Sequence, residues 1–431
     1  MNRLLLYRNF EHEDLVYQMR TLAKKAQIDA LTEDDLECYE NCIHQMIEMA
    51  AAYGLQENLW HSVLACILAN AENAFSKACE KKGLPQGTLS KLVLPDISFW
   101  KEMFAVSLED LDRAFGCSLA ALLENYVNSN TNGHVFNKRI RDSITELGKN
   151  LGACDSEEDF LHTLTDFYRD YGVGKLGLHK AFRIGQDNDG EPIIEPITCT
   201  EHVHLDDLVG YERQKKKLVD NTLSFVNGQA ANNCLLFGDA GTGKSSSIKA
   251  ILNQYYDQGL RMIEVYKHQF KDLNDVIAQI KNRNYKFIIY MDDLSFEEFE
   301  IEYKYLKAVI EGGLEKKPEN VLIYATSNRR HLIREKFSDK EERRDDLHTS
   351  DTVQEKLSLA YRFGLKIYFG SPSKKEFQNI VRVLADKHGI TMSEEELFLK
   401  ANQWELQYGG LSGRTAQQFI DHLLGQERKD V

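Results

Sequence analysis

The chain has 431 residues, 42% of them hydrophobic and 28% charged, a composition typical of a globular protein with two or three domains. Its formal net charge of −14 argues against a general nucleic-acid or anionic-membrane binder, so we expect neither partner. No run approaches about 18 apolar residues, and the N-terminus has too short an apolar stretch for a signal peptide. These features favour a cytoplasmic protein.

The eight cysteines lack the paired C-x-x-C spacing of structural zinc sites. Cys38 and Cys42 lie one helical turn apart with His44 nearby, but two further ligands at a usual spacing are missing. We therefore interpret the cysteines as reduced core thiols of a cytosolic protein.

Residues 1–171 are expected to form a mainly α-helical N-terminal domain. Thr32 and Asp35 form a capping-box pattern ahead of apolar residues spaced three and four apart. A second apolar stripe, 60–75, predicts one helix that stops near Gly83. Nothing in this half indicates catalysis, so its stripes are interpreted as core, with a partner-docking face as the alternative.

Further helices are expected around 99–115 and 119–127, then a loop at 128–133 and a last helix capped by Ser156. The G-x-G-x-x-G pattern at 172–177 follows a helix instead of a strand, so we discount it as a dinucleotide site.

A β-hairpin is expected within 181–198, with its turn at 186–190. We interpret 172–204, which contains it, as a connector between two domains.

Residues Gly238–Ser245 read G-x-x-x-x-G-K-S, the pattern of a phosphate-binding loop. A strand-like apolar run, 234–237, precedes it, and helical spacing over 246–256 follows. The glycines let successive backbone N–H groups point at phosphate oxygens. Lys244 is expected to reach the β- and γ-phosphates, and the Ser245 hydroxyl to ligate Mg²⁺. The predicted nucleotide-binding residues of this segment are Gly238, Asp239, Ala240, Gly241, Thr242, Gly243, Lys244, Ser245 and Ser246.

Downstream of this loop, strand and helix signals alternate, which predicts an α/β domain with a parallel sheet flanked by helices. The apolar run 287–291 ends in Asp292 and Asp293, at the edge where ligands bind in such sheets. Asp292 is expected to hold Mg²⁺, and Asp293 to orient or deprotonate the attacking water. A further buried strand runs into polar residues at the same edge, and Asn328, or Ser327 beside it, is expected to reach the γ-phosphate or that water.

Two arginines complete the set of candidate site residues. Arg362 precedes a short strand and carries the fixed fork of donors that suits a charge developing on phosphate. Ser373 and Glu376 form a capping box that opens a small helical C-terminal domain, in which Arg414 follows a glycine-rich loop. The lysine run 215–217 is interpreted as a solvated helix face.

The order of these elements over 205–430 resembles the AAA+ ATPases. Gly238–Ser245 is similar to the family's Walker A motif, and 288–293 to its Walker B motif. Segments such as GDAGTGKSS and EKLSLAYRFGL are similar to bacterial AAA+ proteins known only as ATP-binding proteins of unknown function. Three further positions match the family, Asn328 as sensor 1, Arg362 as the arginine finger and Arg414 as sensor 2.

This resemblance implies a P-loop NTPase AAA+ core of α/β class with a C-terminal helical lid and a helical N-terminal domain. The expected limits are 1–171 for the helical domain, 172–204 for the connector, 205–370 for the core and 371–431 for the lid. It also implies an ATPase that binds ATP and Mg²⁺ in a homo-oligomer, a ring or hexamer. Arg362 of one subunit would reach the γ-phosphate in the next, and hydrolysis would remodel a protein or other macromolecular partner.

One departure from the family bears on hydrolysis. AAA+ motors usually end Walker B in Asp-Glu, whereas this chain has Asp-Asp, and Glu297 is a weaker substitute base. A switch or loader with little intrinsic hydrolysis is therefore the alternative function. A DNA-dependent ATPase is disfavoured by net charge. An aromatic pore loop at 266–270 is the less favoured interpretation of a strand-to-helix connection.

Overall fold

The computed structural model describes residues 4–128, 138–296, 300–311, 318–328 and 359–427. It divides into two compact units, one of residues 1–179 with 196–199 and one of residues 180–195 with 200–431. The expected loop at 128–133, apart from Asn128, and Glu297 lie outside the described residues. Within the described ranges, no helix is long and apolar enough to cross a membrane.

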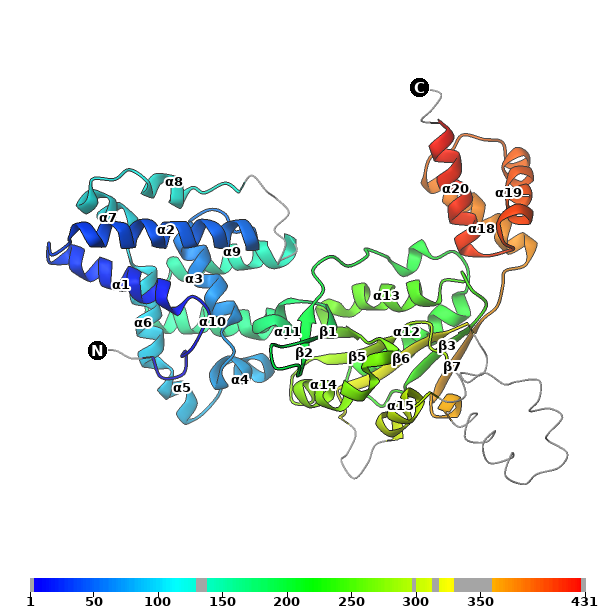
Figure 1. Ribbon diagram of the computed structural model, residues 1–431, viewed down its shortest axis with the longest axis horizontal. Coiled ribbons are helices and arrows are strands. Elements are labelled where there is room, and N and C mark those ends of the chain that lie inside the picture. Colours follow the sequence, from blue (N-terminus) through cyan, green and yellow to red (C-terminus); the bar gives the residue numbers. More distant parts are fainter. Residues whose placement is uncertain (1–3, 129–137, 297–299, 312–317, 329–358, 428–431) are drawn as a thin grey trace. The chain divides into compact units, whose positions relative to one another are not determined.

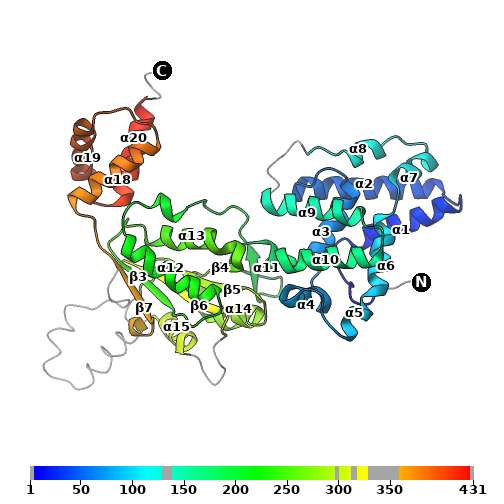
Figure 2. The same cartoon turned by 180° about the vertical axis from the view of Figure 1, so that it is seen from behind.

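The described residues of the first unit fold mainly into helices, as expected (Figures 1 and 2). Its described helices are α1 Glu13–Gln27, α2 Glu33–Tyr53, α3 Leu59–Asn70, α4 Ala74–Lys82, α5 Thr88–Leu92, α6 Leu94–Phe104, α7 Leu108–Phe115, α8 Ala120–Glu124, α9 Lys138–Gly152, α10 Glu157–Tyr171 and α11 Gly174–Leu178. Helix α3 packs against α9, and α4 against α10.

The capping patterns read from the sequence act as predicted at two helices. The Thr32 N–H donates to Asp35 Oδ2 at 2.8 Å ahead of α2, and Ser156 caps α10. The single helix expected over 60–75 is wrong, because α3 ends at Asn70 and α4 starts at Ala74. The Asn73 side chain accepts from the N–H groups at the start of α4, a second cap that the apolar stripe concealed.

The core of the first unit is aromatic and contains one fully buried carboxylate. Asp96 accepts hydrogen bonds from the backbone N–H groups of Leu5, Leu6 and Tyr7 at 2.7, 2.7 and 2.9 Å. The largest fully buried side chains of this unit are Tyr7, Tyr39, Trp60, Phe75, Phe99, Trp100, Phe160 and Tyr168. Burial also raises the pKa of the Cys42 thiol to about 12, which fits the expected core thiol.

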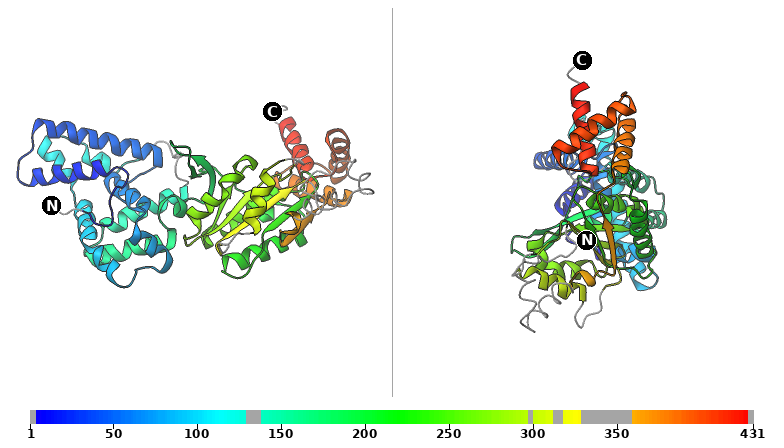
Figure 3. Two further views of the ribbon diagram at one scale, coloured as in Figure 1. Left: turned by 60° about the horizontal axis from the view of Figure 1, so that its bottom comes forward. Right: turned by 90° about the vertical axis from the view of Figure 1, so that its right-hand side faces the viewer.

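Among the described residues, the second unit contains a seven-stranded sheet in the order β2-β1-β4-β5-β6-β3-β7. Its strands are β1 Ala181–Gln186, β2 Pro192–Pro196, β3 Cys234–Gly238, β4 Leu260–Glu264, β5 Lys286–Met291, β6 Val321–Ser327 and β7 Leu365–Phe369. Figure 3 shows the molecule in two further views. In the sheet order from β1 through β4, β5, β6 and β3 to β7, each strand runs parallel to its neighbours. This confirms the predicted α/β class. The carboxyl ends of these strands therefore lie along one edge.

The two strands predicted as a hairpin in the connector belong to this sheet. Ala181 of β1 lies opposite Met262 of β4 in a parallel pair. Residues 180–195 accordingly group with the sheet, while the expected limits of the remaining domains stay predictions.

Helices flank the sheet, and α13 and α14 lie on opposite sides of it in Figure 1. The 3₁₀-helix η3 Lys267–Asp272 follows β4 directly, so the connection has the plain strand-to-helix form, with Tyr266 half exposed. The other described elements around the sheet are η1 Leu205–Asp207, α12 Glu212–Val226, α13 Lys244–Tyr255, η2 Tyr256–Gln258, α14 Leu273–Ile280 and α15 Glu302–Glu311.

The chain ends in a three-helix lid with its own apolar core, as predicted. Its helices are α18 Lys374–Lys387, α19 Glu394–Tyr408 and α20 Gly413–Glu427. Phe377, Val381, Ala401 and Ile420 lie at the centre of that core. The predicted capping box is present, because the Ser373 N–H donates to Glu376 Oε2 at 2.7 Å.

Candidate nucleotide-binding site

The predicted phosphate loop connects the end of β3 to the start of α13. Gly238 has a φ of 133°, and a Cβ there would lie 2.0 Å from the Phe369 carbonyl oxygen of β7. Gly243, the residue before α13, has a φ of 88°. Both positions require glycine, so the loop can lie against β7 and still turn its N–H groups outward.

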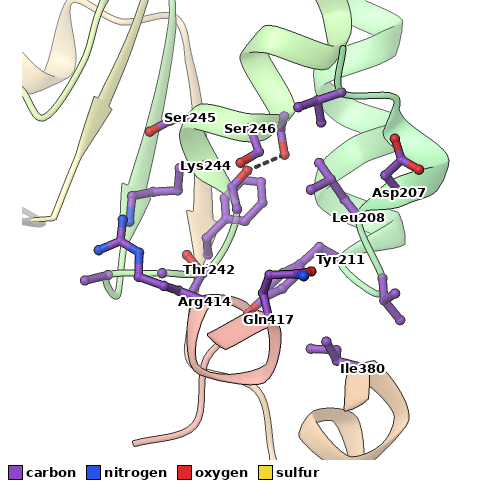
Figure 4. A pocket seen from close by; sticks show the side chains of 18 of the residues that line it. Asp207, Leu208, Tyr211, Thr242, Lys244, Ser245, Ser246, Ile380, Arg414 and Gln417 are labelled. Carbon is purple, nitrogen blue, oxygen red and sulfur yellow. Dashed lines mark hydrogen bonds between the residues drawn. The ribbon is translucent and has the colours of Figure 1, made fainter. Parts of the chain in front are cut away.

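A cavity of about 760 Å³ opens between this loop, the segment before α12 and the lid (Figure 4). That volume falls within the range of small-molecule sites. Its polar end is formed by Thr242, Lys244, Ser245, Asp292, Asp293, Thr326, Asn328 and Arg414. Its other walls include Val203, Leu208, Val209, Tyr211, Ile380 and Leu384. One end therefore suits phosphates and the other an apolar ring.

Lys244 is nearly buried, and its ammonium group is held by three acceptors. Nζ donates to the carbonyl oxygens of Gly238 at 3.0 Å and Asp239 at 2.6 Å, and to Asn328 Oδ1 at 2.9 Å. Burial lowers the pKa of Lys244, while the carboxylates of Asp239, Asp293 and Asp292 oppose that shift. The structure thus brings the predicted phosphate-binding lysine and the predicted sensor asparagine into direct contact.

Asp292 lies at the centre of a cluster of hydroxyl groups. Its Oδ1 accepts from Ser245 Oγ at 2.7 Å and from Thr326 Oγ1 at 2.5 Å. Burial raises the pKa of Asp292, but hydrogen bonds from Thr326 and Ser245 oppose that shift, and the pKa lies below its usual value. A serine hydroxyl and an ionised carboxylate 2.7 Å apart are the oxygen donors that Mg²⁺ prefers, so the residues present fit this ion.

Thr326 could not be identified as a site residue from the sequence, because the only indication of its role is its position two residues before Asn328. Besides its bond to Asp292, Thr326 Oγ1 accepts from the Asp293 N–H at 2.9 Å. Asp293 has a φ of 48°, a left-handed conformation that aspartate tolerates better than most residues. Its Oδ1 accepts from Asn328 Nδ2 at 2.8 Å. The second carboxylate is therefore turned toward the sensor asparagine.

Arg414 lies at the same end of the cavity, at the start of α20 in the lid. Its backbone N–H donates to the Gly241 carbonyl at 3.1 Å, and its positive charge lowers the pKa of Lys244. Figure 4 shows its side chain extending toward Lys244. Among the described residues, its guanidinium group has no hydrogen-bonded or ion-pair partner, so two cations face the polar end of the cavity.

Arg362 lies elsewhere in this unit. Its guanidinium group pairs with the Glu311 carboxylate at the end of α15, and the residue is half-buried. Arg362 is not one of the described residues that line the cavity. Within one chain, the structure therefore does not bring the predicted arginine finger to the phosphate loop.

The expectation that Lys215–Lys217 form a solvated face is wrong for Lys215. That side chain is 9% exposed, and its Nζ donates to the Leu208 carbonyl at 2.7 Å. It fixes the segment that forms one wall of the cavity. Opposite it, Lys387 of α18 pairs with Asp207 of η1 at 2.5 Å, so the lid is tied to the same segment.

Comparisons with known proteins found similar solved structures at low sequence identity. The chain is similar to the FIGL-1 AAA domain in complex with ADP, at 16% identity over 53% of this chain and 76% of that one, with a TM-score of 0.37. It is also similar to a mutant of RuvB from Thermotoga maritima, at 14% identity over 52% of this chain and 65% of the other, with a TM-score of 0.35.

The chain thus spans just under two thirds of that RuvB structure. No curated protein matches the chain. A family model matches residues 178–427, which include the whole sheet, the cavity and the lid helices. The protein belongs to the family described as "Protein of unknown function (DUF815)".

Proposed function

We propose that this protein binds and hydrolyses Mg-ATP, and that it does so in an oligomer to remodel a protein or other macromolecular partner. One observation carries the proposal. Lys244, the Ser245–Asp292–Thr326 cluster and the Asn328–Asp293 pair meet at one edge of the sheet beside a cavity of about 760 Å³. This is the set of cation, hydroxyl, carboxylate and amide that phosphoryl transfer requires.

Each residue has a distinct role in this mechanism. Lys244 and Arg414 bind the phosphate oxygens, and their charges stabilise the negative charge that develops in the transition state. Ser245 and Asp292 would hold Mg²⁺, and the bound ion would supply positive charge that offsets the negative charge of the phosphates. Asp293 accepts a hydrogen bond from the attacking water, and Asn328 fixes the orientation of that carboxylate. Catalysis then rests on positioning and electrostatics.

The oligomer is proposed because Arg362, the predicted arginine finger, is not among the described residues that line the cavity of its own chain. Arg362 pairs with Glu311 of its own chain and is half-buried outside the cavity. Its guanidinium group therefore completes a site in a neighbouring subunit. The helical first unit, which has no candidate catalytic group among its described residues, is the proposed region for partner recognition.

A nucleotide-dependent switch is the second candidate, and the geometry of Asp293 favours it. The carboxylate is one methylene shorter than the usual glutamate, and its Oδ1 is already bonded to Asn328 Nδ2. A general base must reach the water from which it takes a proton. In the switch, bound ATP sets the assembly state and turnover is incidental.

The test is steady-state ATP turnover as a function of protein concentration, beside Lys244→Ala and Arg362→Ala. The oligomeric ATPase predicts turnover per chain that rises with concentration and is lost in both variants. An equimolar mixture of the two variants should regain part of the activity, because an intact loop then faces an intact Arg362.

Tight ATP binding with negligible turnover at every concentration would replace the ATPase with the switch. An Asp293→Glu variant sharpens that outcome, since the longer carboxylate should raise turnover if reach is the limiting factor. Failure of the wild-type protein to bind ATP and Mg²⁺ would contradict both functions.

A further inference from the structure

The phosphate loop is hydrogen-bonded to the segment that joins the sheet to the lid. Asp239 Oδ2 accepts from the Ser371 backbone N–H at 2.7 Å and from Ser371 Oγ at 2.9 Å. The Asp239 N–H donates to the Phe369 carbonyl at 2.9 Å. Residues 370–372 separate β7 from the capping box of α18, so Asp239 holds the lid linker at its first residues.

Asp239 also contacts the phosphate-binding lysine through its main chain. Its carbonyl oxygen accepts from Lys244 Nζ at 2.6 Å and from Thr242 Oγ1 at 2.8 Å. One residue therefore connects Lys244 on one side to Ser371 on the other. The Asp239 side chain bonds Ser371, and Asp239 is not among the described residues that line the cavity.

Phosphate binding at Lys244 must change the hydrogen bonds that this side chain makes. An ammonium group has three donors, and all three are used by Gly238, Asp239 and Asn328. A phosphate oxygen can accept from Lys244 only if one of these bonds is released. One of these three acceptors, at 2.6 Å, is the carbonyl of Asp239, the loop residue that holds the linker, so release of this bond removes a contact of that residue.

An acidic side chain within a phosphate loop must be held away from the phosphates, because a carboxylate facing them would repel them. Hydrogen bonds from Ser371 hold the Asp239 carboxylate on the linker side. The opposite side of the linker is fixed by Tyr211, whose hydroxyl donates to the Gly370 carbonyl at 2.8 Å. The linker is thus held by two side chains of the nucleotide-binding core.

We propose that Asp239 is a positioning residue that couples phosphate occupancy of the loop to the linker of the lid through its bonds to Ser371. The coupling rests on the proposed function, since it requires a nucleotide at Lys244. It goes beyond that function in assigning the lid a response to the phosphates themselves, separate from any contact that the lid makes with the rest of the nucleotide.

The experiment is hydrogen–deuterium exchange of the full chain, followed in peptides that cover residues 369–373, with AMP, Mg-ADP or a non-hydrolysable Mg-ATP analogue. Without nucleotide, Asp239→Ala should raise the exchange rate of the Ser371 amide roughly tenfold or more, because its acceptor is lost. Asp239→Asn keeps a side-chain oxygen and should restore most of that protection.

In the wild-type protein, Mg-ADP and the ATP analogue should change exchange in this peptide, whereas AMP should not, because it lacks the phosphates that reach Lys244. Asp239→Ala should abolish the difference between AMP and the analogue. Lys387→Ala is the matched control, since it breaks the Asp207–Lys387 lid contact without touching the loop and should keep the difference.

Nucleotide binding is measured by calorimetry on the same samples, and folding by thermal melting. If the wild-type protein binds the analogue but exchange at 369–373 is unaffected, or if Asp239→Ala keeps the full response, the coupling is overturned while the proposed function stands. If the wild-type protein binds no nucleotide, the proposed function is overturned and the coupling with it.

Discussion

Two aspartates, one fully buried and one exposed, show how differently the two units use polar groups. In the helical unit, Asp96 is fully buried and bonds three backbone N–H groups of the N-terminal segment. In the nucleotide-binding unit, Asp292 bonds the hydroxyls of Ser245 and Thr326, which belong to two other elements. The first carboxylate fixes the chain, and the second holds side chains that can exchange a partner for a ligand.

The same contrast applies to the other polar groups. Tyr7 and Tyr168 in the helical unit share a buried hydrogen bond of 3.0 Å, and Tyr168 donates onward to the Leu68 carbonyl at 2.8 Å. Lys244 is bonded just as fully, but Lys244 and one of its acceptors, Asn328, line a cavity. Substitutions in the first set should therefore change stability alone, and those in the second set ligand binding alone.

The largest effect is expected for Asp96→Ala, which leaves three N–H groups without their acceptor. The free energy of unfolding of the helical unit should fall by about 3–5 kcal/mol. Chemical denaturation followed by tryptophan fluorescence measures it, since Trp60 and Trp100 lie in that unit. Asp110→Ala, at an exposed aspartate paired with Arg113, is the control and should change stability little. An equal loss in both variants would contradict the comparison.

Lys244→Ala should reduce nucleotide affinity at least a hundredfold, about 2.7 kcal/mol, because the cation at the phosphate end of the cavity is lost. Calorimetric titration with Mg-ADP measures the change. Lys249→Ala removes a lysine from the same helix, one that pairs with Glu201 at 3.1 Å, and should bind nearly as the wild type does. A stability loss in Lys244→Ala similar to that of Asp96→Ala would remove the distinction between the two sets.

Tyr7→Phe should cost about 1 kcal/mol of stability, the usual net value of one buried hydrogen bond. Tyr168→Phe should cost more, because it also removes the bond to the Leu68 carbonyl. The denaturant concentrations at the unfolding midpoints of the two variants show which variant is less stable, provided that both unfold with the same m-value. Nucleotide affinity should be unchanged in both, and a reversed order of stability would contradict the assigned donor directions.

The smallest expected effect is a pH dependence of the stability of the helical unit. Hydrogen bonds from Arg20, which lies 2.6 Å away, hold the pKa of Glu102 below its usual value. Its contribution to stability is therefore fully present above about pH 4.5 and is lost as the pH falls through the lower, folded-state pKa. Glu102→Gln should lose about 1 kcal/mol or less at pH 7, because the pair is partly exposed. The difference from the wild type should shrink below pH 4.5, and a constant difference would exclude the ion pair as its cause.

Much of the fold was predictable because its signals are local. The apolar runs that end at Gly238, Asp292 and Asn328 gave β3, β5 and β6, since a fully buried parallel strand needs a continuous apolar sequence. Caps such as Thr32 were visible for the same reason. The break at Asn73 was missed, because an apolar stripe continues across a helix boundary when both helices bury the same side.

Other features depended on which strands become neighbours. The pairing of β1 with β4 joins residues far apart in sequence, and nothing in the hairpin pattern specifies that edge. Lys215 was misread for a related reason. A lysine run looks solvated until the fold places carbonyl groups such as that of Leu208 around one member of it.

The sequence by itself determined the phosphate loop, the strands that carry its carboxylates and the presence of a helical lid, because each is specified by residue types at fixed short spacing. Only the tertiary structure decided the partners, namely Lys244 with Asn328, Asp292 with Thr326 and Asp239 with Ser371. These pairs are separated by 84, 34 and 132 residues. They meet because parallel strands end at one edge of the sheet, a geometry that strand order creates and local sequence does not encode.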